Sequence, residues 1–314
     1  TPADVTVILQ QAVTATRQLG TAGTFAVLDR VGNVLAVYRM TGAPATTTIN
    51  GQLGAAGGLE GAVVPATLAA ISKAGTGAYL SSQGNAFSTR TASQIIQEHF
   101  DPGQHNSPGG PLFGVQFSQL PCSDVTLKGA GSAGPHPLPL GLSGDPGGIP
   151  LYKNGDIVGG IGVEFDGIYT VDRSVADTDD DPEERVAIAA SIGFEAPSER
   201  TADNISVAGR SLRFSDISYG AITAPETLDE LASGGLTAVP GYGGGSIRGG
   251  VTFGTPQSGI ALTSRAGVPA AVLTGRFGTK GGRALPNGAQ LQAGEVDALL
   301  TSAITTASRT RAAI

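Results

Sequence analysis

The sequence predicts an α+β fold, with helices packed on an antiparallel sheet and a long Gly-rich extension at the C-terminal side. Two observations lead to this prediction. Segments with helical spacing of apolar residues alternate with hairpin signals, and the order over residues 1–197 is α, β, β, α, α, β, β, β, α. Hairpin-joined strands with helices on their faces form an α+β layout. We therefore expect residues 1–197 to form one domain.

An amphipathic helix opens the chain. Its apolar residues recur at helical spacing, at Val5, Ile8, Leu9, Ala12, Val13 and Leu19. Asp4 is placed to cap this helix. A first hairpin then turns at Val31–Asn33, and two further helices are expected over about 65–80 and 89–100.

Three strands are expected to follow these helices. Apolar and small or polar residues alternate over 113–118, which is typical of a half-buried strand. Strands over 149–152 and 157–165 flank Asn154-Gly155, a strong signal for a two-residue hairpin turn.

One face of the last of these strands carries glycines. Gly160, Gly162 and Glu164 alternate with larger apolar residues and so share a face. Glycines on one face let another group approach closely, either a helix or a flat ligand. We favour the helix.

A closing helix is expected to begin after Asp181. This residue is placed as the N-cap, Pro182 occupies the first helical position, and Glu184 can complete a capping box.

The same region contains a dense acidic run, Asp177–Glu184. Calcium takes several oxygen ligands, and carboxylates at Asp177, Asp179, Asp180 and Asp181 could supply them. The alternative, which we favour, is that the run caps the helix and complements its positive N-terminus.

Five segments resemble, in the same order, the motifs of the GlcG/HbpS-like family of small heme-binding domains, which includes the C-terminal domain of PduO-type proteins. They are the first hairpin ending in Arg39-Met-Thr-Gly-Ala43, then Ser72-Lys-Ala-Gly-Thr76, Pro108–Gly114, Gly147–Val163 and Asp181–Ala187. The resemblance covers about residues 3–197. It implies a profilin-like layering of helices on an antiparallel sheet and a heme or other tetrapyrrole ligand.

Two stretches depart from the family pattern. Residues 44–64 and 120–146 are insertions relative to it, and everything after about residue 198 lies outside it.

Heme requires an apolar slot and an axial ligand from His, Met, Cys or Tyr. His99 and His105 are the first candidates, because they lie just before the Pro-Gly-Gly segment, and Met40 is a further one. Arg39 and Lys73 could meet the heme propionates. No family motif chooses between the two histidines.

Composition excludes several partners. The 314 residues carry a net charge of −7 and no basic run, which argues against nucleic acid and anionic membranes. No apolar run approaches the length of a membrane span. Cys122 is the only cysteine, so an intrachain disulfide is excluded. Because the first residue is Thr rather than Met, we expect a removed secretory signal and a periplasmic or secreted protein.

The segment after residue 197 has a different character. Residues 198–290 form a Gly-rich extension, with a short hairpin expected over 205–214, around Ala208-Gly209, and a strand over 268–274. Residues 291–314 are expected to contain a helix, because Val296–Ala307 aligns without a gap on Val5–Thr16 and repeats its apolar stripe.

A repeated opening helix is expected to open a second copy of the domain. Our hypothesis is that the chain is the N-terminal part of a two-repeat protein. It would then be a homo-oligomer, or a hetero-oligomer with a second chain that carries the rest of the second repeat.

Three functions compete at this point. The first is an extracytoplasmic heme- or tetrapyrrole-binding protein. The second is a cofactor-dependent oxidoreductase or its subunit, in which the cofactor supplies the chemistry. The third is a structural assembly protein without a ligand. The sequence contains no hydrolase, zinc-protease or phosphate-loop motif, so it identifies no catalytic residue.

Overall fold

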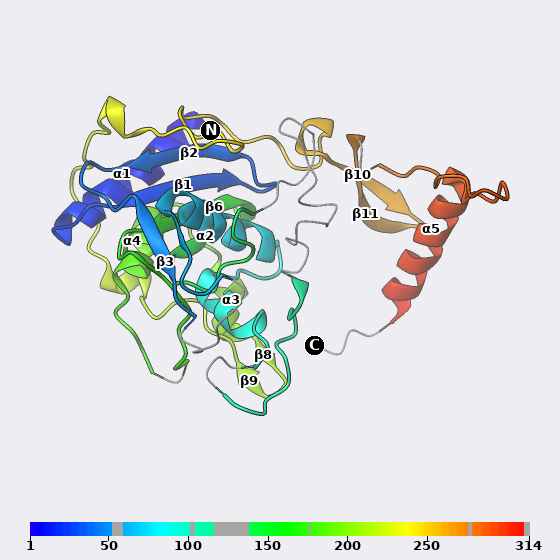
Figure 1. The fold of residues 1–314 in the computed structure, drawn as a ribbon, viewed down its shortest axis with the longest axis horizontal. Helices are drawn as coiled ribbons and strands as arrows, with labels where there is room; N and C mark the ends of the chain where they lie inside the picture. Colours follow the sequence, from blue (N-terminus) through cyan, green and yellow to red (C-terminus); the bar gives the residue numbers. More distant parts are fainter. Residues whose placement is uncertain (52–58, 101–103, 116–137, 176, 276–277, 311–314) are drawn as a thin grey trace. The chain divides into compact units, whose positions relative to one another are not determined.

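The computed structural model describes residues 1–51, 59–100, 104–115, 138–175, 177–275 and 278–310 (Figure 1). The described residues up to Gly250 form one compact unit, and those from Val251 onward form a second. The predicted α+β class is confirmed.

The first unit is built on a four-stranded antiparallel sheet with the strand order β2-β1-β6-β5. Its strands are the two predicted hairpins: β1 (Thr24–Asp29), β2 (Val34–Arg39), β5 (Gly148–Lys153) and β6 (Asp156–Glu164). Asn154 and Gly155 both have positive φ angles between β5 and β6. This is the backbone that a tight hairpin turn of the primed type requires.

Helices cover both faces of this sheet (Figure 1). They are α1 (Pro2–Gln18), α2 (Ala66–Leu80), α3 (Thr89–Ile95) and α4 (Pro182–Ala190). The helix α2 packs on β1, β5 and β6 from one side, while α1 and α4 pack together on the other. The predicted helix over 89–100 is shorter than expected, because regular helix ends at Ile95.

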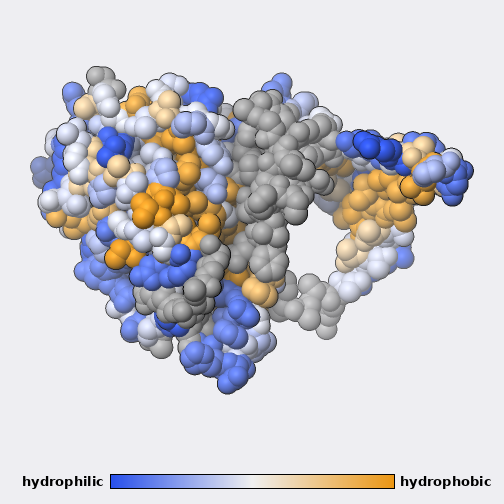
Figure 2. Space-filling model, in the orientation of Figure 1, coloured by the Kyte–Doolittle hydropathy of each residue, from blue (hydrophilic) through white to orange (hydrophobic). Residues whose placement is uncertain are grey.

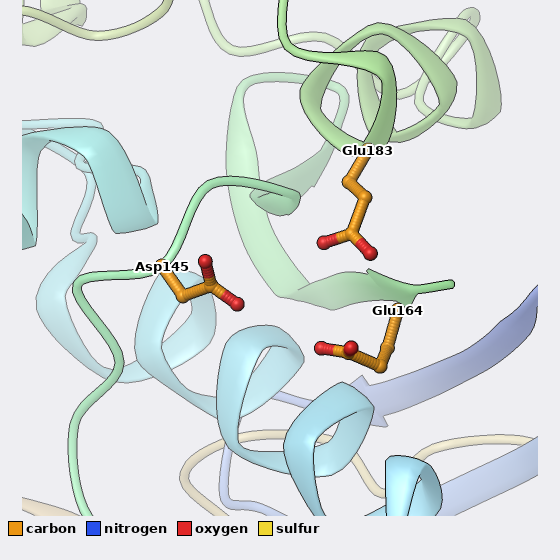
Figure 3. A group of neighbouring side chains, drawn as sticks. All are labelled: Asp145, Glu164 and Glu183. Carbon is orange, nitrogen blue, oxygen red and sulfur yellow. The ribbon is translucent and has the colours of Figure 1, made fainter. Parts of the chain in front are cut away.

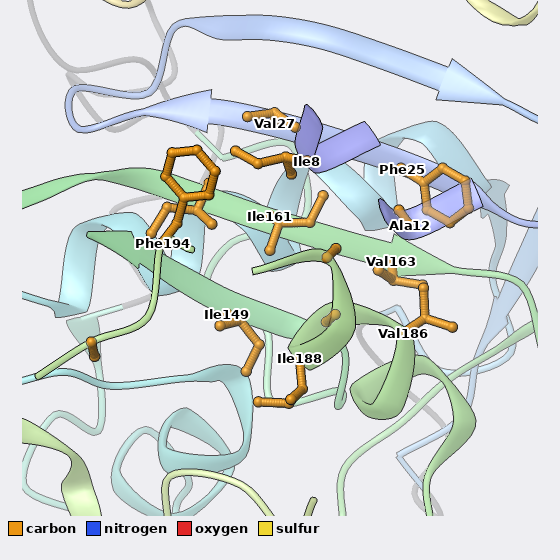
Figure 4. Packing of buried hydrophobic residues seen from close by; sticks show 14 of the residues in the cluster. Ile8, Ala12, Phe25, Val27, Ile149, Ile161, Val163, Val186, Ile188 and Phe194 are labelled. Atoms are coloured by element: carbon orange, nitrogen blue, oxygen red, sulfur yellow. The ribbon is translucent and has the colours of Figure 1, made fainter. Parts of the chain in front are cut away.

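The larger core lies between the sheet and the pair α1 and α4 (Figure 4). The predicted stripe of α1 is buried there except at Leu19, which follows the helix and is exposed. The N-cap is Thr1 rather than Asp4. The Asp4 carboxylate instead completes a capping box from the third helical position, and it pairs with the amino terminus.

The strand predicted over 113–118 is wrong for its described part. Residues 111–114 form turns, and Gly114 has a positive φ angle. Leu112 N–H donates to the carbonyl of Ile95, so this backbone is satisfied by the end of α3 instead of by a neighbouring strand. Phe117 lies outside the described residues.

Two small sheets complete the first unit. One joins β3 (Thr46–Ile49), β4 (Val63–Pro65) and β7 (Ile168–Tyr169), with β3 antiparallel to β4 and parallel to β7. The other is the predicted short hairpin, β8 (Ser206–Val207) with β9 (Arg210–Ser211).

Much of the Gly-rich extension packs on the first unit. Val37 N–H donates to the carbonyl of Gly244, and Val37 in turn accepts a hydrogen bond from Thr237. This segment therefore covers the outer edge of β2, which would otherwise present open backbone groups.

The second unit contains a hairpin and a helix. The hairpin joins β10 (Ile260–Arg265) to β11 (Val268–Leu273), of which only β11 was predicted, and the predicted helix is α5 (Ala293–Arg309). Arg265 pairs with Asp297 at 2.5 Å and so ties the hairpin to the helix. Among the described residues, no helix has the length and apolar character needed to cross a membrane.

Candidate functional site

His99 is the predicted ligand whose surroundings suit a metal-bound imidazole. It follows α3, it is half-buried, and its Nδ1 lies 3.1 Å from the carbonyl oxygen of Ser107. A carbonyl only accepts, so Nδ1 carries the hydrogen, and in the neutral imidazole Nε2 then presents a lone pair. A backbone carbonyl on one nitrogen is the usual way in which proteins orient a histidine that binds metal through the other.

The Pro108-Gly-Gly segment positions this hydrogen bond. Phe100 N–H donates to the carbonyl of Pro108 at 2.8 Å, and Gly110 N–H donates to the carbonyl of Gln97 at 2.9 Å. A Cβ at Gly110 would lie 2.3 Å from the carbonyl oxygen of Ile95. Only glycine permits this approach, so the family-like motif brings Ser107 to His99.

The other predicted heme contacts lie in other settings. His105 is exposed in the same loop as Ser107. Arg39 donates to the carbonyl of Ala43 at 2.6 Å. Met40 is buried, and its sulfur accepts the N–H of Gly23 at 3.4 Å. Arg39 and Met40 thus close the end of β2 through local contacts.

Lys73 points into a buried acidic cluster. Its Nζ lies 2.7 Å from Asp145 and 3.0 Å from Glu164, and it also donates to Glu183. The Lys73 side chain is fully buried, and each of the three acidic side chains is almost fully buried. Figure 3 shows these carboxylates pointing toward one another from the loop before β5, the end of β6 and the start of α4.

The segment Ser72-Lys-Ala-Gly-Thr76, another of the five family-like motifs, builds this cluster. The hydroxyl of Ser72 accepts the N–H of Leu140 at 2.9 Å, and that of Thr76 accepts the N–H of Ser143 at 2.8 Å. These two hydroxyls lie one turn apart on α2 and hold the loop that carries Asp145 next to Lys73.

The electrostatics of the cluster are unusual. Burial raises the pKa of Asp145 and of Glu183, although Lys73 acts in the opposite direction on both. Burial alone would lower the pKa of Lys73, but the surrounding carboxylates outweigh it and raise that pKa. The three carboxylates offer oxygens within 4.8 Å of one another. The ammonium of Lys73 occupies the place that a bound cation would take.

Arg90 forms a second buried cluster. Its Nε lies 2.9 Å from Glu184, and its Nη1 lies 2.7 Å from Asp172 and 3.1 Å from Asp216. Burial raises the pKa of Glu184 to about 7 against the opposing effect of Arg90. The predicted N-cap is confirmed, because Asp181 accepts the Glu184 N–H at 2.8 Å. The Glu184 side chain, however, turns to Arg90 instead of completing a capping box.

The structure does not gather the four predicted calcium ligands. Asp181 caps α4, Asp180 pairs with Arg185 at 2.5 Å, and Asp177 is exposed. Asp179 lies 3.8 Å from Arg90, which already supplies a positive charge there.

The sequence does contain a signal for the Lys73 cluster. Lys73 is the only charged residue of α2, and Glu164 shares the strand face on which the glycines receive that helix. A charge on each side of one interface predicts an ion pair. Asp145 had no such signal, because it lies in a stretch expected to be an insertion.

The fold and the site define an α+β protein with helices on both faces of one antiparallel sheet and two buried ionic clusters. Comparison with solved structures finds a similar chain in the PduOC:heme complex, with 16% identity and a TM-score of 0.37 over 62% of this chain and 95% of that one. ORFY from Klebsiella pneumoniae is 18% identical, with a TM-score of 0.36 over 61% and 88% of the two chains. A double mutant of HbpS from Streptomyces reticuli is 18% identical, with a TM-score of 0.33 over 62% and 85%.

By name, PduOC and HbpS correspond to the family whose motifs the five segments resemble. At TM-scores this low, the likeness says nothing about what this chain binds. No family model matches the sequence, and no curated protein matches it.

Proposed function

We propose that this chain is a heme- or tetrapyrrole-binding protein in which His99 is the axial ligand of the iron. The hydrogen bond between His99 Nδ1 and Ser107 carries the proposal, because it leaves Nε2 as the lone-pair donor. The resemblance of five motifs to heme-binding domains supports it, and one of those motifs builds this hydrogen bond.

Exposed apolar side chains on the loop that follows Ser107 support a porphyrin ligand. Phe113 and Val115 lie on the neighbouring loop with 43% and 47% of their surface exposed, which is the apolar surface that a flat macrocycle covers. Arg210 lies over the ring of Phe100 at 5.2 Å and brings a positive charge near the loop. In this proposal Arg210, rather than the buried Lys73, pairs with a propionate, and bound heme supplies any redox chemistry.

Hemin titration of the purified protein tests the proposal. We expect saturable binding with one hemin per chain and a Soret band shifted from that of free hemin. A protein that stays colourless with excess hemin would contradict both the heme and the cofactor-dependent readings.

We further propose that α5 opens a second copy of the fold and is covered by another chain. The helices α1 and α5 have equal length, and each begins with a capping box that uses an acidic residue, Asp4 or Glu295. The hydroxyls of Thr14 and Thr305, at matched positions, each donate to the carbonyl four residues earlier.

The two helices differ in burial. The stripe of α1 is buried against α4 and the sheet, whereas Leu299 and Leu300 of α5 are 61% and 42% exposed. Figure 2 shows apolar surface on the second unit, to which α5 belongs. An amphipathic helix gains most of its stability when its stripe is covered, so we expect a partner subunit to cover this one.

A further inference from the structure

The Lys73 cluster brings a primary amine against carboxyl groups inside the core; Glu183 lies closest to the amine, and Asp145 comes next. Nζ of Lys73 lies 2.7 Å from Oδ2 of Asp145, and the two side chains are 0% and 4% exposed. Buried ion clusters add little net stability, because removing the charges from water costs about as much as their attraction returns. Stability alone therefore does not account for these buried charges, and we consider the chemistry that the groups could carry out.

The contact with Asp145 also differs from an ordinary ion pair. Oδ2 of Asp145 receives no well-aligned hydrogen bond from any described residue, although Nζ is 2.7 Å away. The oxygens of Glu164 share this lack of a partner, but Glu164 lies farther from Nζ, at 3.0 Å. Glu183 is held differently: its Oε1 accepts the N–H groups of Phe165 and Asp166, and its Oε2 faces Lys73. Backbone hydrogen bonds therefore hold the Glu183 carboxylate beside the amine, whereas Oδ2 of Asp145 only contacts the amine.

We propose that Lys73 and Asp145 condense to an intramolecular isopeptide bond, with Glu183 as the proton carrier. A lysine amine becomes a nucleophile when it loses its proton in an apolar site next to a base. The partners required are an amine, a carboxyl group and a proton carrier, all shielded from water, and the cluster contains each of them.

The step balances without any other reactant. Lys73 passes a proton from its ammonium to the Glu183 carboxylate, and the neutral amine attacks Cγ of the protonated Asp145 carboxyl. The new C–N bond forms as a C–O bond breaks. Glu183 gives the proton it accepted to the departing hydroxyl, which leaves as water, and then takes the second amine proton. The products are an amide, one water molecule and a protonated Glu183, and nothing is oxidised or reduced.

Burial favours this outcome. The raised pKa of Asp145 favours the protonated carboxyl that the amine attacks, and the raised pKa of Glu183 makes it a better acceptor for the Lys73 proton, although the raised pKa of Lys73 opposes that transfer. The reaction replaces a buried ammonium and a buried carboxylate by neutral groups, which removes a desolvation cost. The bond would tie α2 covalently to the loop before β5.

Intact-mass spectrometry of the denatured full chain tests the proposal. We expect a mass lower than that of the sequence by one water molecule, and a branched peptide joining Lys73 to Asp145 after proteolysis. The full sequence mass in folded wild-type protein would overturn the proposal. A branch at Glu164 or Glu183 would overturn the assignment to Asp145.

Variants make the chemistry specific. In Asp145→Asn the leaving group is ammonia, so we expect the mass to fall by one ammonia instead of one water. Asp145→Ala should keep its full mass. Asp172→Asn changes a buried carboxylate beside Arg90, which cannot condense, and serves as the matched control: it should still lose one water through Lys73 and Asp145. The mass of the wild-type protein alone decides whether the bond forms, so the test remains valid even if a variant fails to fold.

Discussion

Gly160 in β6 lies directly against the carbonyl of Ala74 in α2: a Cβ at position 160 would lie 2.1 Å from that oxygen. A Cβ at Gly162 would lie at the same distance from the carbonyl oxygen of Ala70, one turn earlier. The glycine face of β6 therefore receives a helix, which confirms the reading favoured from the sequence. A flat ligand at this face is excluded, because α2 already occupies it.

Replacing Gly160 by alanine should destabilise the first unit. The new methyl group would collide with backbone rather than with an adaptable side chain, and overpacking of this kind costs about 1–3 kcal/mol or more. Urea unfolding should show the loss as a lower midpoint. Gly84→Ala is the control, since its Cβ would meet only Ser82 Oγ, at 3.7 Å. Equal midpoints for the two variants would contradict the close approach.

The sequence predicted those elements whose signals are local. The Asn154-Gly155 turn, the stripe of α1 and the Asp181 cap each depend on residues a few positions apart. The strand over 113–118 failed for the opposite reason. Its alternation of apolar and polar residues is genuine, but Gly110 lets the segment fold back on α3, and the hydrogen bonds to that helix outweigh a strand preference.

The candidate site was predictable only in part. His99 was named from its place before the Pro-Gly-Gly segment, but its preference over His105 depends on the carbonyl of Ser107, which the fold supplies. Lys73 was named as a partner for heme propionates, whereas its partners are carboxylates from three separate segments of the chain, and they bury it. Contacts between distant segments leave no periodic trace in a single sequence.

Replacing His99 by alanine should remove the iron ligand while leaving the fold intact. We expect hemin affinity to fall by at least about tenfold, which corresponds to about 1.4 kcal/mol, and the Soret band to move toward that of unligated hemin. His105→Ala is the matched control in the same loop and should bind like the wild type. Imidazole added to the His99 variant should restore the ligated spectrum. The reverse pattern would assign the iron to His105.

Glu184 should make stability depend on pH. Its folded-state pKa of about 7 lies above the ordinary value of 4.5, so the folded state holds the proton more tightly. Its contribution to stability is therefore complete below pH 4.5 and is lost as the pH rises through about 7. This pKa difference corresponds to about 3 kcal/mol.

Urea unfolding of wild type and Glu184→Gln across this range provides the measurement. The wild type should lose stability relative to the variant as the pH rises, because Gln keeps the neutral form throughout. High salt should leave the effect in place, since the group is buried and weakly screened. A difference between the two proteins that does not change with pH would show that folding leaves the pKa of Glu184 unchanged.

Asp181 and Asp180 should differ although they are neighbours in the acidic run. Asp181→Ala removes the N-cap of α4 and should cost about 1 kcal/mol. Asp180→Ala removes only an exposed pair with Arg185 and should cost less than about 0.5 kcal/mol. Thermal unfolding of both variants measures the difference. If calcium stabilises the wild type and both variants abolish that effect, the two residues share a metal site after all.

Leu300→Glu should weaken subunit association through α5. A leucine that is covered by a partner contributes about 1.5–3 kcal/mol, so the charged variant should associate at least about tenfold more weakly. Ser302→Glu places the same charge on the opposite side of the same helix and should leave assembly unchanged. Sedimentation velocity over a range of concentrations distinguishes the two variants. If both associate like the wild type, α5 does not contribute to the interface, and its likeness to α1 reflects only a common helical pattern.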